Sequence, residues 1–182
     1  MANAYNLQTI ISRYAKAYYM VYKDRVTLEN RNTMIAISKL LERDRSFLIL
    51  INNTLKDYID LKVSIFGDYL KIYNLDLPFV QLIRLLLTHA RLMLLPQILQ
   101  GIVNLYDIEK EIAIFHITTP TLISQEGKTA ISSFLGSATK KTIFCNYAID
   151  ASLVAGFRAQ SKEFLYENSV RKKLQTLTHL ID

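Results

Sequence analysis

The spacing of the apolar residues changes once along this chain, and this change limits the possible folds more than any other feature. Up to about residue 106, apolar side chains recur at intervals of three and four, the period of an amphipathic helix. Beyond that point, short β-branched and aromatic runs alternate with a period of two, as strands do. The sequence therefore predicts a mainly α chain, with a five- or six-helix bundle over residues 1–106 and a small α+β domain over residues 107–182.

Four helical segments are expected before residue 75. They cover residues 7–22, 34–41, 47–51 and 55–73. Thr54 is placed to cap the last of them, because its hydroxyl can accept a bond from an early backbone N–H. Pro78 and Pro96 suit the first turns of two further helices, where the missing N–H is no loss. Since the helix after Pro78 is apolar on nearly every side, we expect it to be the central, buried helix.

The second part of the chain mixes strands and helices in the order β-α-β-β-β-α. We expect a strand over 112–117, a helix capped by Ser124, a strand over 140–149, a hairpin made by 156–161 and 163–166, and a closing helix from Val170 to Leu180. Residues 143, 145, 147 and 149 should share one face of the second strand. The hinge between the two parts is predicted near residues 107–111.

Several functional classes lack the residues that they need. The five glycines and three prolines argue against a collagen-like or disordered chain, and the single Cys145 cannot form an internal disulfide. With three histidines and no CxxC, HExxH, GxSxG or phosphate-binding glycine loop, we predict no metal, cofactor or catalytic residue. No segment approaches the ~20 clean apolar residues of a membrane span.

The net charge of +6 leaves one alternative open. Residues 1–106 carry 13 lysines and arginines against 8 acidic residues, an excess of five. A basic helical protein that binds nucleic acid would show such an excess, and its affinity would fall steeply with salt. Because the basic residues are spread over several helices and interleaved with acids, we expect no nucleic-acid partner.

Segments at both ends of the chain resemble one family. Residues 13–18, Arg-Tyr-Ala-Lys-Ala-Tyr, resemble the Tyr-Ala-x-Ala-aromatic opening helix of the F-type ATP synthase delta subunit, the counterpart of the oligomycin-sensitivity-conferring protein. Residues 149–157 and 167–174 resemble its C-terminal signature, in which Asp, Ser and a glycine precede a strand pair and Ser-Val-Arg. Residues 82–84 and 90–96 resemble its fifth helix and the turn into the sixth.

Two departures from the family's pattern concern turns. Ala155-Gly156 stands where the family often has two glycines, which leaves one residue suited to a positive φ. Asn168 stands near the family's Asp-Gly, and asparagine tolerates the left-handed region and can cap a helix.

The resemblance implies a non-catalytic stator subunit, present once per complex. Such a subunit ties the catalytic head to the peripheral stalk, so that proton-driven rotation is coupled to ATP synthesis. Residues 1–106 would receive the N-terminal segment of an alpha subunit as an amphipathic helix, in a helix-in-groove mode. Residues 107–182 would meet the C-terminal end of the stalk's b subunit.

The resemblance also suggests which residues bind these partners. For the alpha subunit, the candidates on the first and fifth helices are Tyr14, Ala15, Ala17, Tyr18, Leu82, Ile83, Arg84 and Leu86. The alternative for each is the bundle's own core, and for the three aliphatic residues of the fifth helix the core is the preferred interpretation. For the stalk, the candidates on the closing helix are Val170, Leu174 and Leu177.

The resemblance places the protein at an energy-coupling membrane, which it would reach only through the complex. In a bacterium this is the cytoplasmic face of the inner membrane. The first residues resemble neither a secretory signal nor a transit peptide, which favours a bacterial or an organelle-encoded origin. For the latter, the thylakoid or inner mitochondrial membrane is the alternative.

Overall fold

A computed structural model describes residues 2–53, 58–70, 73, 77–170 and 172. The chain divides into two compact units, residues 1–106 and 107–182, which we call the N-terminal unit and the C-terminal unit.

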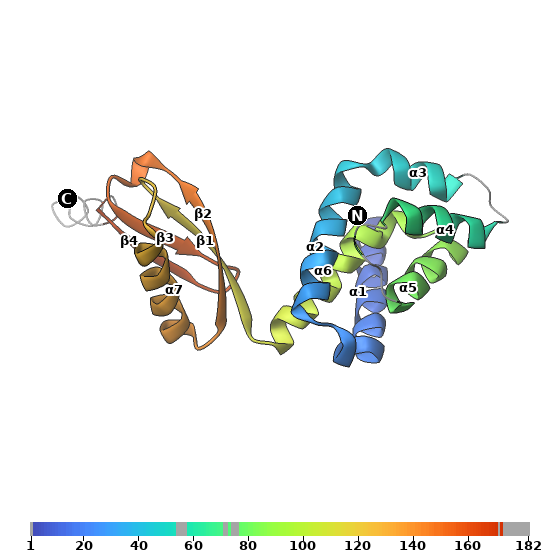
Figure 1. Ribbon diagram of the computed structural model, residues 1–182, viewed down its shortest axis with the longest axis horizontal. Helices are drawn as coiled ribbons and strands as arrows, with labels where there is room; N and C mark the ends of the chain where they lie inside the picture. Colours follow the sequence, from blue (N-terminus) through green and yellow to red (C-terminus); the bar gives the residue numbers. More distant parts are fainter. Residues whose placement is uncertain (1, 54–57, 71–72, 74–76, 171, 173–182) are drawn as a thin grey trace. The chain divides into compact units, whose positions relative to one another are not determined.

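The N-terminal unit is a bundle of α-helices (Figure 1). They are α1 (Ala2–Tyr22), α2 (Leu28–Arg43), α3 (Arg45–Asn53), α4 (Ile59–Tyr69), α5 (Leu77–Thr88) and α6 (Leu95–Glu109). Thr27 caps the start of α2, where its side chain accepts a bond of 3.2 Å from the Asn30 N–H. The bundle confirms the predicted helical first part, whereas the expected Thr54 cap lies outside the described residues.

Burial corrects the expectation that the helix after Pro78 is the central, buried helix. Gln81, Arg84 and Leu85 of α5 are exposed. In α6, by contrast, four side chains have no exposed surface, those of Leu95, Ile98, Leu99 and Ile102. The prediction was wrong because it gave the many leucines of α5 more weight than the glutamine and the arginine, which mark a side of the helix that faces solvent.

Helices α1 and α6 approach each other closely at Gly101. A Cβ atom built on Gly101 would lie 2.9 Å from the Cβ of Ala15, closer than two methyl groups can pack. Ala15 is itself buried. Two small residues on facing helices therefore set the separation of α1 and α6 at this point.

The corner between α2 and α3 is fixed by the Asp44 carboxylate. The Tyr69 hydroxyl of α4 donates to it at 2.8 Å, and the Ser46 hydroxyl donates at 3.0 Å. These two bonds, first that from Tyr69, hold the pKa of Asp44 below its ordinary value. The Tyr69 ring also stacks on Phe47 of α3, with 3.8 Å between ring centroids. Tyr69 of α4 therefore contacts both Asp44, at the corner, and the first turn of α3.

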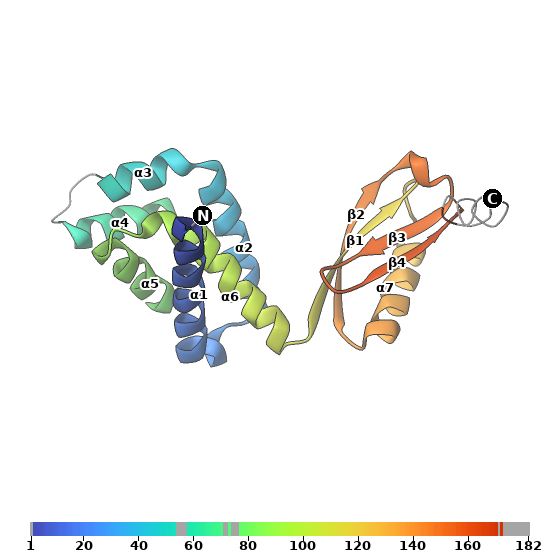
Figure 2. The ribbon, with the colours of Figure 1, turned by 180° about the vertical axis from the view of Figure 1, so that it is seen from behind.

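The C-terminal unit packs a four-stranded sheet against α7 (Gln125–Thr139), as the two opposite views show (Figures 1 and 2). Its strands are β1 (Ile112–Thr119), β2 (Thr142–Ile149), β3 (Gly156–Gln160) and β4 (Leu165–Ser169), in the spatial order β2-β1-β3-β4. Strands β1 and β2 are parallel, and the other neighbours are antiparallel. This confirms the small α+β part of the predicted fold.

One face of the sheet and α7 enclose the core of this unit. Its buried members are Ala113, Phe115, Ile117, Leu135 and Ala159. Ile143, Cys145 and Tyr147 of β2 pack against them, as their alternation predicted. The Ser124 cap is also confirmed, since its hydroxyl accepts a bond of 3.2 Å from the Gly127 N–H.

The turn into β3 depends on a glycine. Gly156 has φ +94°, and a Cβ atom there would collide with the backbone oxygen of Asn168 on β4. The expectation that Gly156 is the residue suited to a positive φ is confirmed. Asn168 belongs to β4, and it is the Ser169 hydroxyl that accepts a bond, of 3.2 Å, from the Lys172 N–H.

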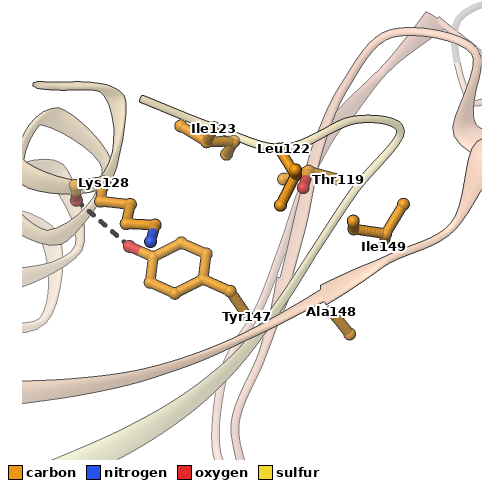
Figure 3. A pocket seen from close by; sticks show the side chains of 7 residues that line it. All are labelled: Thr119, Leu122, Ile123, Lys128, Tyr147, Ala148 and Ile149. Atoms are coloured by element: carbon orange, nitrogen blue, oxygen red, sulfur yellow. Dashed lines mark hydrogen bonds between the residues drawn. The ribbon is translucent and has the colours of Figure 1, made fainter. Parts of the chain in front are cut away.

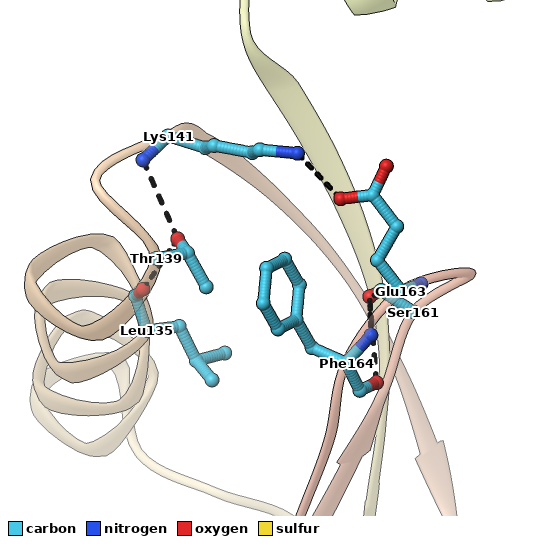
Figure 4. Close-up of polar contacts among 6 residues, drawn as sticks. All are labelled: Leu135, Thr139, Lys141, Ser161, Glu163 and Phe164. Carbon is cyan, nitrogen blue, oxygen red and sulfur yellow. Dashed lines mark hydrogen bonds and ion pairs between the residues drawn. The ribbon is translucent and has the colours of Figure 1, made fainter.

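The loop between β3 and β4 is tied to the end of α7 (Figure 4). Lys141, just after α7, forms an ion pair of 2.5 Å with Glu163, and its ammonium lies 5.5 Å from the centroid of the Phe164 ring. The Phe164 N–H donates to the Ser161 hydroxyl at 2.9 Å, which closes the loop. These contacts hold the start of β4 over the core, where Phe164 stacks with Phe115.

Candidate partner-binding surface

The four candidates on α1 divide between surface and core. Ala17 is exposed and Tyr14 is half-buried. Ala15 and Tyr18 are buried, at 2% and 8% exposure, the first against α6 and the second against the Tyr22 ring, 5.1 Å away. A partner could therefore touch Tyr14 and Ala17 without any rearrangement, while Ala15 and Tyr18 support the helix from within.

The candidates on α5 divide in the same way. Leu82, Ile83 and Leu86 are at most 4% exposed, so these three side chains belong to the core of the bundle. Arg84 faces solvent and forms an ion pair of 2.6 Å with Asp60 of α4. Because both partners are more than half exposed, this pair contributes little to stability, and Arg84 remains free to contact a partner.

Polar contacts join α1 to α5 and to the segment after it. The Tyr22 hydroxyl donates to Gln81 Oε1 at 2.5 Å. Near the other end, Arg91 Nη1 donates to the Tyr14 hydroxyl at 3.1 Å, and the guanidinium carbon lies 5.9 Å from the centroid of that ring. Two polar contacts thus link α1 to distant parts of the sequence, one at Gln81 of α5 and one at Arg91 after α5.

Both helices also carry apolar side chains that face solvent. On α1, exposed Leu7, Ala17 and Val21 follow the helical repeat together with half-buried Tyr14, and on α5 the exposed residues are Leu77 and Leu85. We call these six residues, together with Gln81 and Arg84, the α1–α5 strip. Val21 is 71% exposed and Leu77 66%, values far from those of a core.

Five members of the strip were missed as partner-binding candidates, namely Leu7, Val21, Leu77, Gln81 and Leu85. Periodicity assigned Val21 and Leu85 to the apolar side of their helices without showing which part of that side neighbouring helices would cover. The wide apolar arc of α5 was a useful signal. When an apolar arc is wider than the core can cover, some of its side chains face solvent or a partner.

The stalk candidates are only partly described. Val170 is 37% exposed and follows the Ser169 hydroxyl that caps the backbone N–H of Lys172. Leu174 and Leu177 lie outside the described residues. Within the described part of the chain, the surface predicted to meet the stalk therefore consists of Val170.

The described part of the chain contains no group of three or more His, Cys, Asp or Glu side chains that could hold a metal ion. It also contains no helix that is both long enough and apolar enough to span a bilayer.

Comparison with known proteins gives a consistent set of relatives. The sequence model of a family described as ATP synthase delta (OSCP) subunit matches residues 10–181. The ATP synthase subunit delta of Pasteurella multocida is 25% identical over 175 residues, which cover 95% of this chain and 96% of the relative. That of Methylobacillus flagellatus is 26% identical over 176 residues, covering 95% and 96%.

A solved structure supports the fold. A chain from the cryo-EM structure of the Toxoplasma gondii mitochondrial ATP synthase hexamer is similar with a TM-score of 0.62, and the match covers 94% of this chain and 96% of that one. At 15% identity, this likeness bears on the fold alone.

Proposed function

The chain belongs to the ATP synthase delta (OSCP) subunit family, and on that premise we propose that it is a non-catalytic stator subunit. It links the catalytic head to the peripheral stalk, so that the head does not turn with the rotor and proton-driven rotation is coupled to ATP synthesis. One copy serves each complex. It reaches the membrane only through that complex, on the side of the catalytic head, which in a bacterium is the cytoplasmic face.

The observation that carries the proposal is the exposure of the α1–α5 strip. Apolar side chains that face solvent in rows along two neighbouring helices suit the apolar face of a third helix. The N-terminal segment of the alpha subunit is the proposed occupant. Arg84, beside the apolar row, is of a type that often anchors interfaces.

The division into two units suits a linking role. Each unit buries its own set of apolar side chains, so each can present a surface without relying on the other for its fold. We assign the alpha subunit to the N-terminal unit and the C-terminal end of the b subunit to the C-terminal unit, around Val170.

Binding of a synthetic peptide tests the first assignment. The peptide carries the N-terminal segment of the alpha subunit from the same complex, and the full chain is titrated by calorimetry and circular dichroism. We expect one-to-one binding, added helix and a negative heat-capacity change from apolar burial. Ala17→Glu places a charge in the strip and should weaken affinity at least about tenfold, or ~1.4 kcal/mol.

Ser12→Glu is the matched control. Ser12 is also a small exposed residue of α1, and it lies on the other side of the helix from Ala17. The same charge added there should leave affinity within about twofold. Equal losses in the two variants, or undiminished affinity in a folded Ala17→Glu variant, would contradict the α1–α5 strip as the site.

A further inference from the structure

A cavity of about 330 Å³ opens where the parallel strands β1 and β2 end, beside the first turns of α7 (Figure 3). We call it the α7–β2 pocket. Its lining residues are Thr119, Leu122, Ile123, Lys128, Tyr147, Ala148 and Ile149. The pocket arises from the topology, because parallel strands end at one edge of the sheet and the chain must cross from there into α7.

The wall of the pocket is apolar and partly open to water. Leu122 is 86% exposed and Ile149 58%, although both are aliphatic. Across from them lies the Tyr147 ring, whose hydroxyl donates to the backbone oxygen of Lys128 at 3.2 Å. Burial, and then the neighbouring Cys145, raise the pKa of Tyr147 to about 12, so its hydroxyl stays protonated and can donate this bond at physiological pH.

Lys128 supplies the one charge in the lining of this pocket. Its ammonium lies 5.3 Å from the centroid of the Tyr147 ring, which directs the side chain along the pocket wall (Figure 3). Among the residues that the structure describes, no carboxylate forms an ion pair with it. An apolar pocket with a single cation in its wall suits a ligand in which an aliphatic group lies next to an anionic group.

The neighbouring backbone indicates that such a group belongs to a polypeptide. Strand β2 is an edge of the sheet, and within the described residues it pairs with β1 alone. Its last residues, Ala148 and Ile149, line the pocket. Unpaired backbone groups at a sheet edge can bond to a peptide backbone, which a lipid chain cannot offer.

We propose that the α7–β2 pocket binds a partner polypeptide segment in which an aliphatic side chain adjoins a carboxylate. The aliphatic group fills the apolar part of the pocket between Leu122 and Ile149, and the carboxylate pairs with the Lys128 ammonium. This site is separate from the α1–α5 strip and does not depend on the proposed stator role.

N-Acetyl-leucine is the smallest probe with an aliphatic side chain, a peptide group and a carboxylate, and N-acetyl-leucinamide lacks only the charge. Each is titrated into the full chain while backbone amide chemical shifts are followed. We expect saturable shifts at Thr119, Tyr147 and Ile149 with a millimolar dissociation constant for the acid, as suits so small a ligand. The amide should bind at least about threefold more weakly, or ~0.7 kcal/mol.

Lys128→Met keeps the aliphatic stem and the backbone oxygen that Tyr147 bonds, and it removes the charge. It should lower the affinity for the acid to that for the amide. Lys140→Met, at an exposed lysine directly after α7, is the control and should change neither affinity. The proposal is overturned if acid and amide bind the wild-type chain equally, if neither shifts the lining residues, or if both lysine variants weaken the acid alike.

Discussion

A single hydroxyl, that of Tyr69, connects α4 to the corner between α2 and α3. It donates to the Asp44 carboxylate, and it is the largest cause of the lowered pKa of Asp44. A carboxyl whose pKa is lower in the folded than in the unfolded chain stabilises the fold above its unfolded pKa, here 3.8. That stabilisation is lost as the pH falls through the lower, folded value.

Tyr69→Phe should therefore lower the melting temperature near neutral pH by a few degrees. The stacking on Phe47 is kept, so the loss reports the hydroxyl alone. As the pH falls below 3.8 and through the lower pKa of the folded wild-type chain, Asp44 becomes protonated in both proteins and the difference should shrink. Thermal unfolding followed by circular dichroism at several pH values measures it.

Tyr58→Phe is the control for this experiment, because Tyr58 is 62% exposed. It should leave the melting temperature unchanged at every pH. If the Tyr69→Phe difference stays constant down to about pH 2, well below the ordinary pKa of an aspartate, the hydroxyl acts through something other than the ionised Asp44.

The helices and strands themselves could be predicted because each pattern reports a local period. The Ser124 cap, the β2 alternation and the glycine at the start of β3 follow from short stretches of sequence. The exposure of a helix face could not be predicted in this way. Whether Leu85 or Leu86 meets solvent depends on which helix covers α5, and this is decided by contacts between residues far apart in the chain.

The same limit explains the outcome for the partner candidates. Tyr14, Ala17 and Arg84 are accessible, whereas Ala15, Tyr18, Leu82 and Leu86 are buried. A short motif of apolar or small residues has the same sequence pattern whether its side chains pack within the bundle or bind a partner. Ala15 is small because α6 passes over it at Gly101.

The contact between α1 and α6 can be tested by changing its two small residues. Gly101→Ala gains helix propensity of about 1 kcal/mol, but its methyl group would lie 2.9 Å from that of buried Ala15. Overpacking of this kind typically costs about 1–3 kcal/mol, so we expect a net loss of stability in the N-terminal unit. Urea denaturation measures the change.

The double variant Ala15→Gly with Gly101→Ala moves the methyl group from one helix to the other. It should be more stable than the sum of the two single effects predicts, with a coupling of at least about 0.5 kcal/mol. Strictly additive effects would mean that these positions do not limit the approach of α1 and α6.

The two units have separate cores, and this has a consequence for the unfolding of the whole chain. Residues such as Leu99 bury in a core made by helices, and residues such as Phe115 bury between the sheet and α7. A unit that holds its own core can unfold in its own transition, because its main stabilising contacts are internal. Changes that act inside one core should then leave the other transition unchanged.

Two glycine variants separate the transitions, with hydrogen exchange of individual amides followed in increasing denaturant. Gly101→Ala should lower the protection of α6 and leave that of β1 unchanged. Gly156→Ala should lower the protection of β1 by at least about 2 kcal/mol and leave that of α6 unchanged, because its Cβ atom meets the Asn168 backbone at a positive φ.

Gly136→Ala is the control. Gly136 is a helical position at which an added Cβ atom makes an ordinary contact of 3.8 Å with Ile143, so this variant should instead stabilise the C-terminal unit slightly. If each destabilising variant lowers protection equally in α6 and β1, the chain unfolds as one cooperative body, and the two units are not independent carriers of the proposed head and stalk surfaces.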